Sequence, residues 1–79
     1  MQTMYTNFDA AKAALKVHGG FLIETNLDRE WWLAADYIEA VEILTWAGGS
    51  REQAFNYLIA HPAFTDGSVV RSSDYIESL

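Results

Sequence analysis

The sequence contains no cysteine and a single proline among its 79 residues. Without cysteine there are no disulfide bonds, thiolate nucleophiles or zinc–thiolate sites, and a reducing compartment is favoured. With one proline and no low-complexity stretch there is no interdomain linker, so we expect residues 1–79 to form one compact domain. No apolar run approaches the roughly 20 residues of a transmembrane helix, and the first residues lack the basic segment of a signal peptide. We therefore expect a soluble, cytoplasmic protein that does not bind a membrane.

Basic residues are also scarce in this sequence. Five lysines and arginines stand against 11 acidic residues, which gives a net charge of -6. The imbalance is concentrated between residues 20 and 50, where six acidic residues are accompanied by Arg29 alone. Such a segment repels nucleic acid and attracts basic protein surfaces, so direct binding of nucleic acid is disfavoured. An alternative is that the negative charge only keeps a small, apolar-rich protein in solution.

The patterns typical of catalysis and metal binding are missing as well. Neither His18 nor His61 has a candidate metal ligand three or four residues before it, a spacing that would place two ligands on one helix face. No serine lies in a nucleophile-elbow pattern, and no lysine follows the glycine pair at 19–20 as in a phosphate-binding loop. We expect carboxylate pairs such as Glu39 and Glu42 to be solvated rather than buried for acid–base work. The sequence thus predicts a protein that is not an enzyme and uses no cofactor or metal.

The sequence is rich in core-forming residues, with 51% hydrophobic and 14% aromatic side chains. Its clearest element is a helix over residues 36–47. Asp36 can cap the first turn while Glu39 reaches back in a capping box, and the glycine pair at 48–49 can end the helix. At 100° per residue, one side of this helix forms an apolar face that we expect to enter the core, made of Tyr37, Ala40, Val41 and Leu44.

The opposite side of the same helix carries Asp36, Glu39 and Glu42. No lysine or arginine lies within the helix to pair with these carboxylates, and Ile43 and Trp46 are expected to project among them. An acidic surface with a large aromatic side chain indicates a binding site, because tryptophan is enriched at binding hot spots. Trp46 could instead pack over the start of the next helix.

Residues 20–25 and 30–34 predict a β-hairpin, because both runs are short, contain β-favouring side chains and flank turn residues. If Thr25 faces Glu30, the strand register follows. We expect the more apolar face, with the pairs Ile23–Trp32 and Phe21–Ala34, to enter the core, while the other face carries Leu22–Leu33 and Glu24–Trp31.

A competing interpretation begins one long helix near Leu27 and continues it into residues 36–47. We prefer the hairpin because Asp36 with Glu39 marks a new helix start and because a lone strand would lack a partner. On a strand, Trp31 and Trp32 point to opposite faces. One of them is then exposed, unless helix 7–18 or the C-terminal segment covers the second face.

The remaining segments are mainly helical. A helix over 7–18 can be capped by Thr6 or Asn7, and Ser50 with Gln53 forms a capping box for a helix that ends before Pro62. Val69 and Val70 could add a short third strand at the edge of the hairpin, and residues 72–79 could form a helical turn. The expected fold is a small α+β single domain in α-β-β-α-α order, with the hairpin packed on helices. The buried stripe of the 50–61 helix is expected to contain Ala54, Phe55, Leu58 and Ile59.

With 79 residues, a net charge of -6, six acids and one arginine between Glu24 and Glu42, and no catalytic motif, the sequence resembles the anti-CRISPR proteins that phages encode. The resemblance implies binding to a Cas effector complex in the host cytoplasm, at the basic channel that receives DNA. It also implies an acidic surface that stands in for phosphates. Helical neighbours three or four residues apart lie about 5 to 6 Å from each other, so Asp36, Glu39 and Glu42 could present such a row.

The leading hypothesis is therefore a non-enzymatic, DNA-mimicking inhibitor of a protein partner that has a basic nucleic-acid-binding surface. The alternative is a homo-oligomeric structural or adaptor protein, in which exposed tryptophans and Ile43 bury against a second copy. The sequence leaves open whether the protein is a monomer or a small homo-oligomer. The expected partner contacts are Glu24, Asp28, Glu30, Asp36, Glu39 and Glu42, with Trp46 or Trp31 as the anchor.

Overall fold

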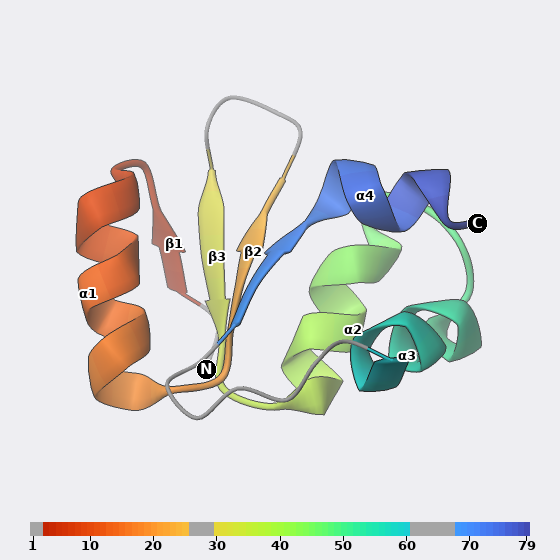
Figure 1. Cartoon of the computed structure of the whole chain (residues 1–79), viewed down its shortest axis with the longest axis horizontal. Helices are drawn as coiled ribbons and strands as arrows, with labels where there is room; N and C mark the ends of the chain where they lie inside the picture. Colours follow the sequence, from red (N-terminus) through yellow and green to blue (C-terminus); the bar gives the residue numbers. More distant parts are fainter. Residues whose placement is uncertain (1–2, 26–29, 61–67) are drawn as a thin grey trace.

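The computed structural model describes residues 3–25, 30–60 and 68–79 and shows an α+β domain with helices on both faces of a four-stranded sheet (Figure 1). The predicted fold class is confirmed. In chain order the elements are β1 (Thr3–Tyr5), α1 (Phe8–His18), β2 (Phe21–Glu24), β3 (Trp31–Ala34), α2 (Tyr37–Thr45), α3 (Arg51–Ala60), β4 (Ser68–Arg71) and α4 (Ser72–Glu77).

The predicted hairpin forms the centre of the sheet. Strands β2 and β3 pair antiparallel in the expected register, with Phe21 opposite Ala34 and Ile23 opposite Trp32. The Thr25 N–H donates to the Glu30 carbonyl at 3.1 Å, which closes the described part of the hairpin. The competing long helix is wrong, because residues 31–34 form a strand that hydrogen-bonds on both sides.

The sheet order is β1-β3-β2-β4. The third strand expected at Val69 and Val70 is confirmed as β4, which runs parallel to β2. Strand β1 was not predicted; it pairs antiparallel with β3 and extends the sheet at the other edge. Three residues are too few to show an alternating pattern. The expected turn at 26–29 and the expected helix stop at Pro62 lie outside the described residues.

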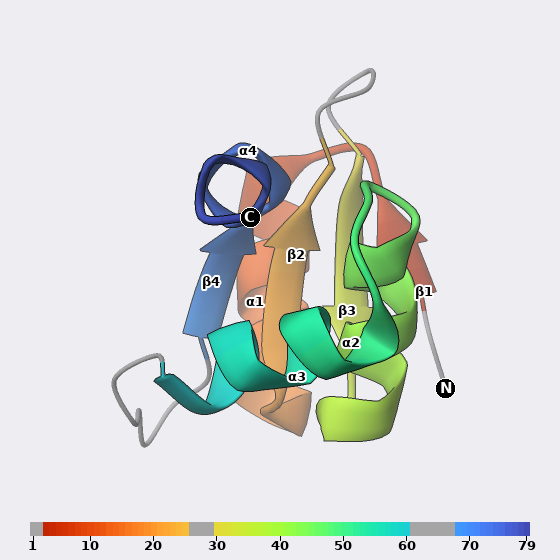
Figure 2. The ribbon, with the colours of Figure 1, turned by 90° about the vertical axis from the view of Figure 1, so that its right-hand side faces the viewer.

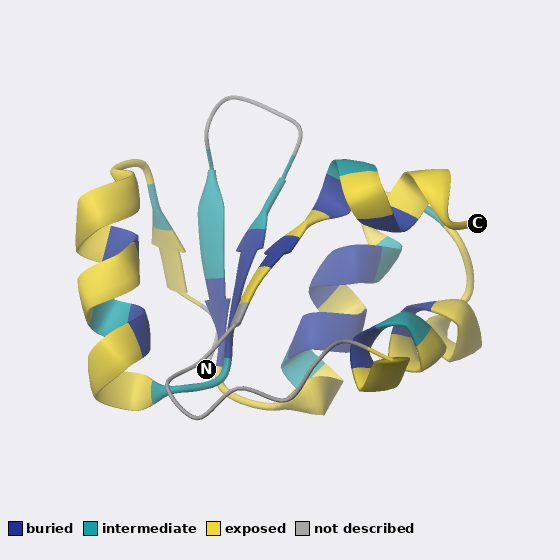
Figure 3. Cartoon of the chain, in the orientation of Figure 1, coloured by how far each residue is buried: buried dark blue, intermediate teal, exposed yellow. Residues whose placement is uncertain are grey.

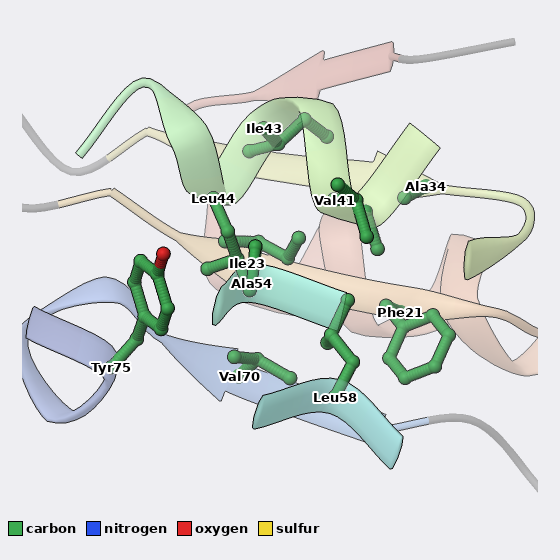
Figure 4. Close-up of a cluster of buried hydrophobic side chains, with 11 residues drawn as sticks. Phe21, Ile23, Ala34, Val41, Ile43, Leu44, Ala54, Leu58, Val70 and Tyr75 are labelled. Atoms are coloured by element: carbon green, nitrogen blue, oxygen red, sulfur yellow. The ribbon is translucent and has the colours of Figure 1, made fainter. Parts of the chain in front are cut away.

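Helix α1 covers one face of the sheet, and α2, α3 and α4 cover the other (Figures 1 and 2). The face predicted to enter the core does so, with Phe21, Ile23 and Ala34 in the larger buried cluster beside α2 and α3 (Figure 4). A smaller cluster lies under α1 and joins Ala11 and Leu15 to the other sheet face. Both tryptophans of β3 are thereby half-buried, which answers the question of the second face.

Helix α2 begins as predicted. The Asp36 side chain accepts a hydrogen bond from the Glu39 N–H at 2.9 Å, and Glu39 reaches back to the Ala35 N–H at 2.9 Å. The expected projection of Ile43 into solvent is wrong, since this residue is only 1% exposed. Ile43 belongs to the larger buried cluster, together with residues of the sheet. Tyr37, placed on the core face, is in fact 44% exposed.

Helix α3 also begins with the predicted capping box, in which Ser50 and Gln53 exchange backbone-to-side-chain hydrogen bonds of 2.8 and 3.1 Å. Its buried stripe is narrower than expected. Ala54 and Leu58 are buried, whereas Phe55 and Ile59 are 45% and 53% exposed. Helix α3 lies at the periphery of the domain and meets the core along one line of residues (Figures 2 and 3), so half of the predicted stripe is wrong.

Candidate functional site

The sheet separates the predicted contact residues into two groups. Side chains alternate between the faces of a strand, so Trp31 and Trp32 point to opposite sides. Trp31 packs with the cluster under α1, and Trp32 packs with the cluster beside α2. Asp28 lies outside the described residues.

On the α1 side, Trp31 contacts Phe8 with ring centroids 4.6 Å apart, and the Lys12 ammonium lies 5.6 Å from the Phe8 ring. Glu24 lies opposite Trp31 in the register and forms a 3.7 Å ion pair with Arg71. Of the two predicted partner contacts on this side, Trp31 therefore already packs against an aromatic ring, and Glu24 already pairs with a cation. They are not brought together with the acids of α2.

On the α2 side, Trp46 stands edge-on to Trp32, with ring centroids 4.9 Å apart and an angle of 82° between the rings. The Trp32 Nε1–H donates to Glu30 Oε1 at 3.2 Å. Trp46 remains 51% exposed. These contacts connect the exposed Trp46, the half-buried Trp32 and the Glu30 carboxylate across the surface from α2 to β3.

Two further acids extend this surface along α2. Glu39, Glu42 and Trp46 follow one another at i, i+3 and i+7, a spacing that keeps them on one side of a helix. We call the five residues of this surface the α2 flank: Glu30, Trp32, Glu39, Glu42 and Trp46.

The carboxylates of Asp36, Glu39 and Glu42 differ in their hydrogen bonds and ion pairs. Asp36 and Glu39 form the helix cap. The hydrogen bond from the Ala35 N–H is one of the interactions that lower the pKa of the Glu39 carboxyl. Glu42 is exposed, and among the described residues neither Asp36 nor Glu42 takes part in an ion pair. Glu42 is the carboxylate of α2 whose substitution should disturb the fold least.

The described cations lie away from the α2 flank. Lys12 and Lys16 are on α1, across the sheet from α2 (Figure 1). Arg71 pairs with Glu24, and Arg51 borders a different hollow of α2, together with Tyr37 and Ile38. The charge of the α2 flank is therefore not screened by these four cations at contact distance.

A pocket of about 360 Å³ adjoins the α2 flank. It lies between the end of the hairpin, the C-terminal end of α2 and helix α4. Sequence reasoning missed it, because three segments far apart in the chain build it. Its described lining residues are Thr25, Glu30, Ile43, Trp46, Ala47, Ser72 and Ile76.

A second surface was also missed. Tyr37, Ile38, Phe55 and Ile59 are exposed at the N-terminal half of α2 and along α3, with Ile38 at 71%. The Tyr37 and Phe55 rings lie 6.0 Å apart. We call these four residues the apolar patch. The signal that could have found it is the breadth of the hydrophobic stripe on the 50–61 helix, which is wider than a small core can cover.

The described residues contain no group of three or more histidine, aspartate or glutamate side chains placed to hold a metal ion. A hollow of about 550 Å³ lies beside α1 and is lined by Asp9 and Glu24 among small polar residues and two aromatic rings. His18 borders another hollow beside β1 and β3. None of the described helices combines the length and the apolar character that crossing a bilayer requires.

Comparisons with protein-family models, with curated proteins and with solved structures find no match to this chain. The function of the protein must therefore be inferred from the surfaces described above.

Proposed function

We propose that this protein is a non-enzymatic inhibitor that binds a protein partner through the α2 flank. The observation that supports the proposal best is the row of Glu39, Glu42 and Trp46 on one side of α2, continued by Glu30 across the Trp32–Trp46 contact. An exposed tryptophan beside carboxylates offers both an apolar anchor and charge complementarity to a basic surface.

The class of partner follows from charge. A surface that binds nucleic acid is basic over a wide area, so acidic groups that take the place of the phosphates are attracted to it. The small size, net charge of -6 and acidic middle segment resemble phage anti-CRISPR proteins. We therefore propose the DNA-binding channel of a Cas effector complex as the target, in the cytoplasm of the host cell.

The test is competition for DNA. Guide-loaded effector complexes of different types would be incubated with the protein, and binding of labelled target DNA would be measured by gel shift. We expect one type to lose DNA binding. Glu42→Lys should weaken the inhibition by about tenfold or more, because a like charge would then face the basic channel.

The matched control is Asp9→Lys, which changes the net charge equally but lies on α1, across the sheet. It should inhibit nearly as well as the unsubstituted protein once circular dichroism has shown that both variants are folded. Equal inhibition by the unsubstituted protein, Glu42→Lys and Asp9→Lys would show that the α2 flank does not bind the effector complex. If no effector type loses DNA binding in the presence of the protein, the proposed target is wrong.

A second candidate function is self-association, which the apolar patch favours. Four exposed apolar side chains on adjoining helices could bury against a second copy. Ile43 is buried and Trp31 and Trp32 are half-buried, so among these residues and Trp46 only Trp46, which is 51% exposed, is open to a second copy. We therefore assign the self-association interface to the apolar patch. Light scattering over a range of concentrations tests it: Phe55→Ser should abolish a dimer, and Trp46→Ala should leave it intact.

A further inference from the structure

The pocket beside the α2 flank combines apolar walls with one fixed carboxylate. Ile43, Trp46 and Ile76 supply the walls, and Glu30 supplies the charge. The hydrogen bond from Trp32 Nε1 to Glu30 Oε1 holds this carboxylate in place, and the second carboxylate oxygen receives no hydrogen bond from Trp32. An acceptor that is held in position loses less side-chain entropy when it binds a partner.

The chemistry of the pocket matches a basic side chain. None of its described lining residues is basic, so no lysine or arginine of the described lining neutralises Glu30. A volume of about 360 Å³ is at the small end of ligand pockets, sufficient for one long side chain. The Trp46 ring, held edge-on by Trp32 and 51% exposed, can receive a cation within about 6 Å of its face.

From these features we infer that the pocket takes an arginine side chain of the partner. The aliphatic stem would lie along Ile43 and Ile76, and the guanidinium would stack on Trp46 and donate to Glu30. Arginine fits better than lysine, because its planar group both stacks on aromatic rings and donates two parallel hydrogen bonds to a carboxylate. This inference rests on the proposed function, since it assumes a basic protein partner.

The pocket can be tested without the partner. The probe is N-acetyl-arginine-methylamide, titrated into the ¹⁵N-labelled full chain, with N-acetyl-citrulline-methylamide as an uncharged analogue of the same shape. Three tryptophans give three indole N–H signals. We expect the arginine probe to shift the Trp46 and Trp32 signals with saturation in the millimolar range, as befits a single side chain. The citrulline probe should bind at least about tenfold more weakly.

Variants make the test specific. Glu30→Gln keeps an acceptor for Trp32 but removes the charge, and it should weaken arginine binding by about tenfold to a hundredfold. Glu42→Gln removes the same charge outside the pocket and should change the affinity less than about twofold. Equal binding of the arginine and citrulline probes, or equal loss in both variants, would overturn the inference.

The outcome separates this inference from the proposed function. If arginine fails to bind while Glu42→Lys still impairs inhibition of the effector complex, only the pocket assignment is wrong. If arginine binds and no effector complex is inhibited, the pocket assignment is supported and the proposed target is wrong.

Discussion

At the scale of single residues, Tyr75 connects the C-terminal helix to the turn between α2 and α3. Its side chain is fully buried, and its hydroxyl donates to the Gly48 carbonyl at 2.9 Å. Gly49 has a φ of +76°, and a Cβ atom there would lie 2.6 Å from the Tyr75 hydroxyl. A side chain at position 49 would therefore displace the contact that holds α4, and with it the Ile76 wall of the pocket.

We predict that Tyr75→Phe lowers the free energy of unfolding by about 1 kcal/mol, because the Gly48 carbonyl loses its donor while the ring remains. Tyr75→Ala also leaves a cavity and should cost about 3 to 5 kcal/mol. Urea denaturation measures both values. A Tyr75→Phe variant as unstable as Tyr75→Ala would show that the hydroxyl, and not the packed ring, holds α4.

The same buried tyrosine predicts a loss of stability in alkali. Burial raises the pKa of Tyr75 above 10.0, and burial followed by the Asp74 charge raises that of Tyr57. The neutral phenols are favoured in the folded state, so their contribution is complete below about pH 10 and is lost as the pH rises toward the folded pKa. The urea concentration at the denaturation midpoint should decrease as the pH is raised above 10. The decrease should be less steep in the Tyr57→Phe/Tyr75→Phe double variant. Equally steep curves would contradict this assignment.

Burial of individual residues was only partly predictable from the sequence. The helical wheel places Ile43 among the acidic residues of α2, and only the packing of the helix against the sheet shows that it is buried. Phe55 and Ile59 satisfy the apolar period equally well but lie over solvent. Periodicity identifies a face, whereas the width of that face depends on how far the neighbouring elements extend.

At the scale of elements, local capping explains why helices and strands begin where they do. Both capping boxes were predictable, because each depends on two side chains three residues apart and on nothing distant. The hairpin register followed from one pairing choice. Strand β1 was not predictable, because its three residues form a strand only by pairing with β3.

For α2, we predict that Asp36→Ala lowers the free energy of unfolding by about 1 kcal/mol, because the Glu39 N–H loses its acceptor. Asp36→Asn keeps a good cap and should cost less. Glu42→Ala, on the exposed side of the same helix, should change stability by less than about 0.5 kcal/mol. Thermal and urea unfolding compare the three, and a cost at Glu42 equal to that at Asp36 would refute the division of α2 into capping and surface carboxylates.

At the scale of the whole molecule, the sheet decides which acids can act together. The sequence groups Glu24, Glu30 and the α2 acids in one acidic segment. The fold places Glu24 beside Arg71 and gathers Glu30 with Trp46 at one pocket. This separation and the pocket itself were not predictable from the sequence, because both depend on β4 and α4 returning to the hairpin.

In the proposed function, the α2 flank binds a basic surface largely through charge. The most direct measurement is the dissociation constant for the effector complex that the protein inhibits, determined between about 50 and 200 mM salt. We predict that affinity falls steeply with salt for the unsubstituted protein and for Asp9→Lys, and that Glu42→Lys shows weaker binding with a smaller slope. The same affinity and slope in all three proteins would contradict binding through the charge of the α2 flank.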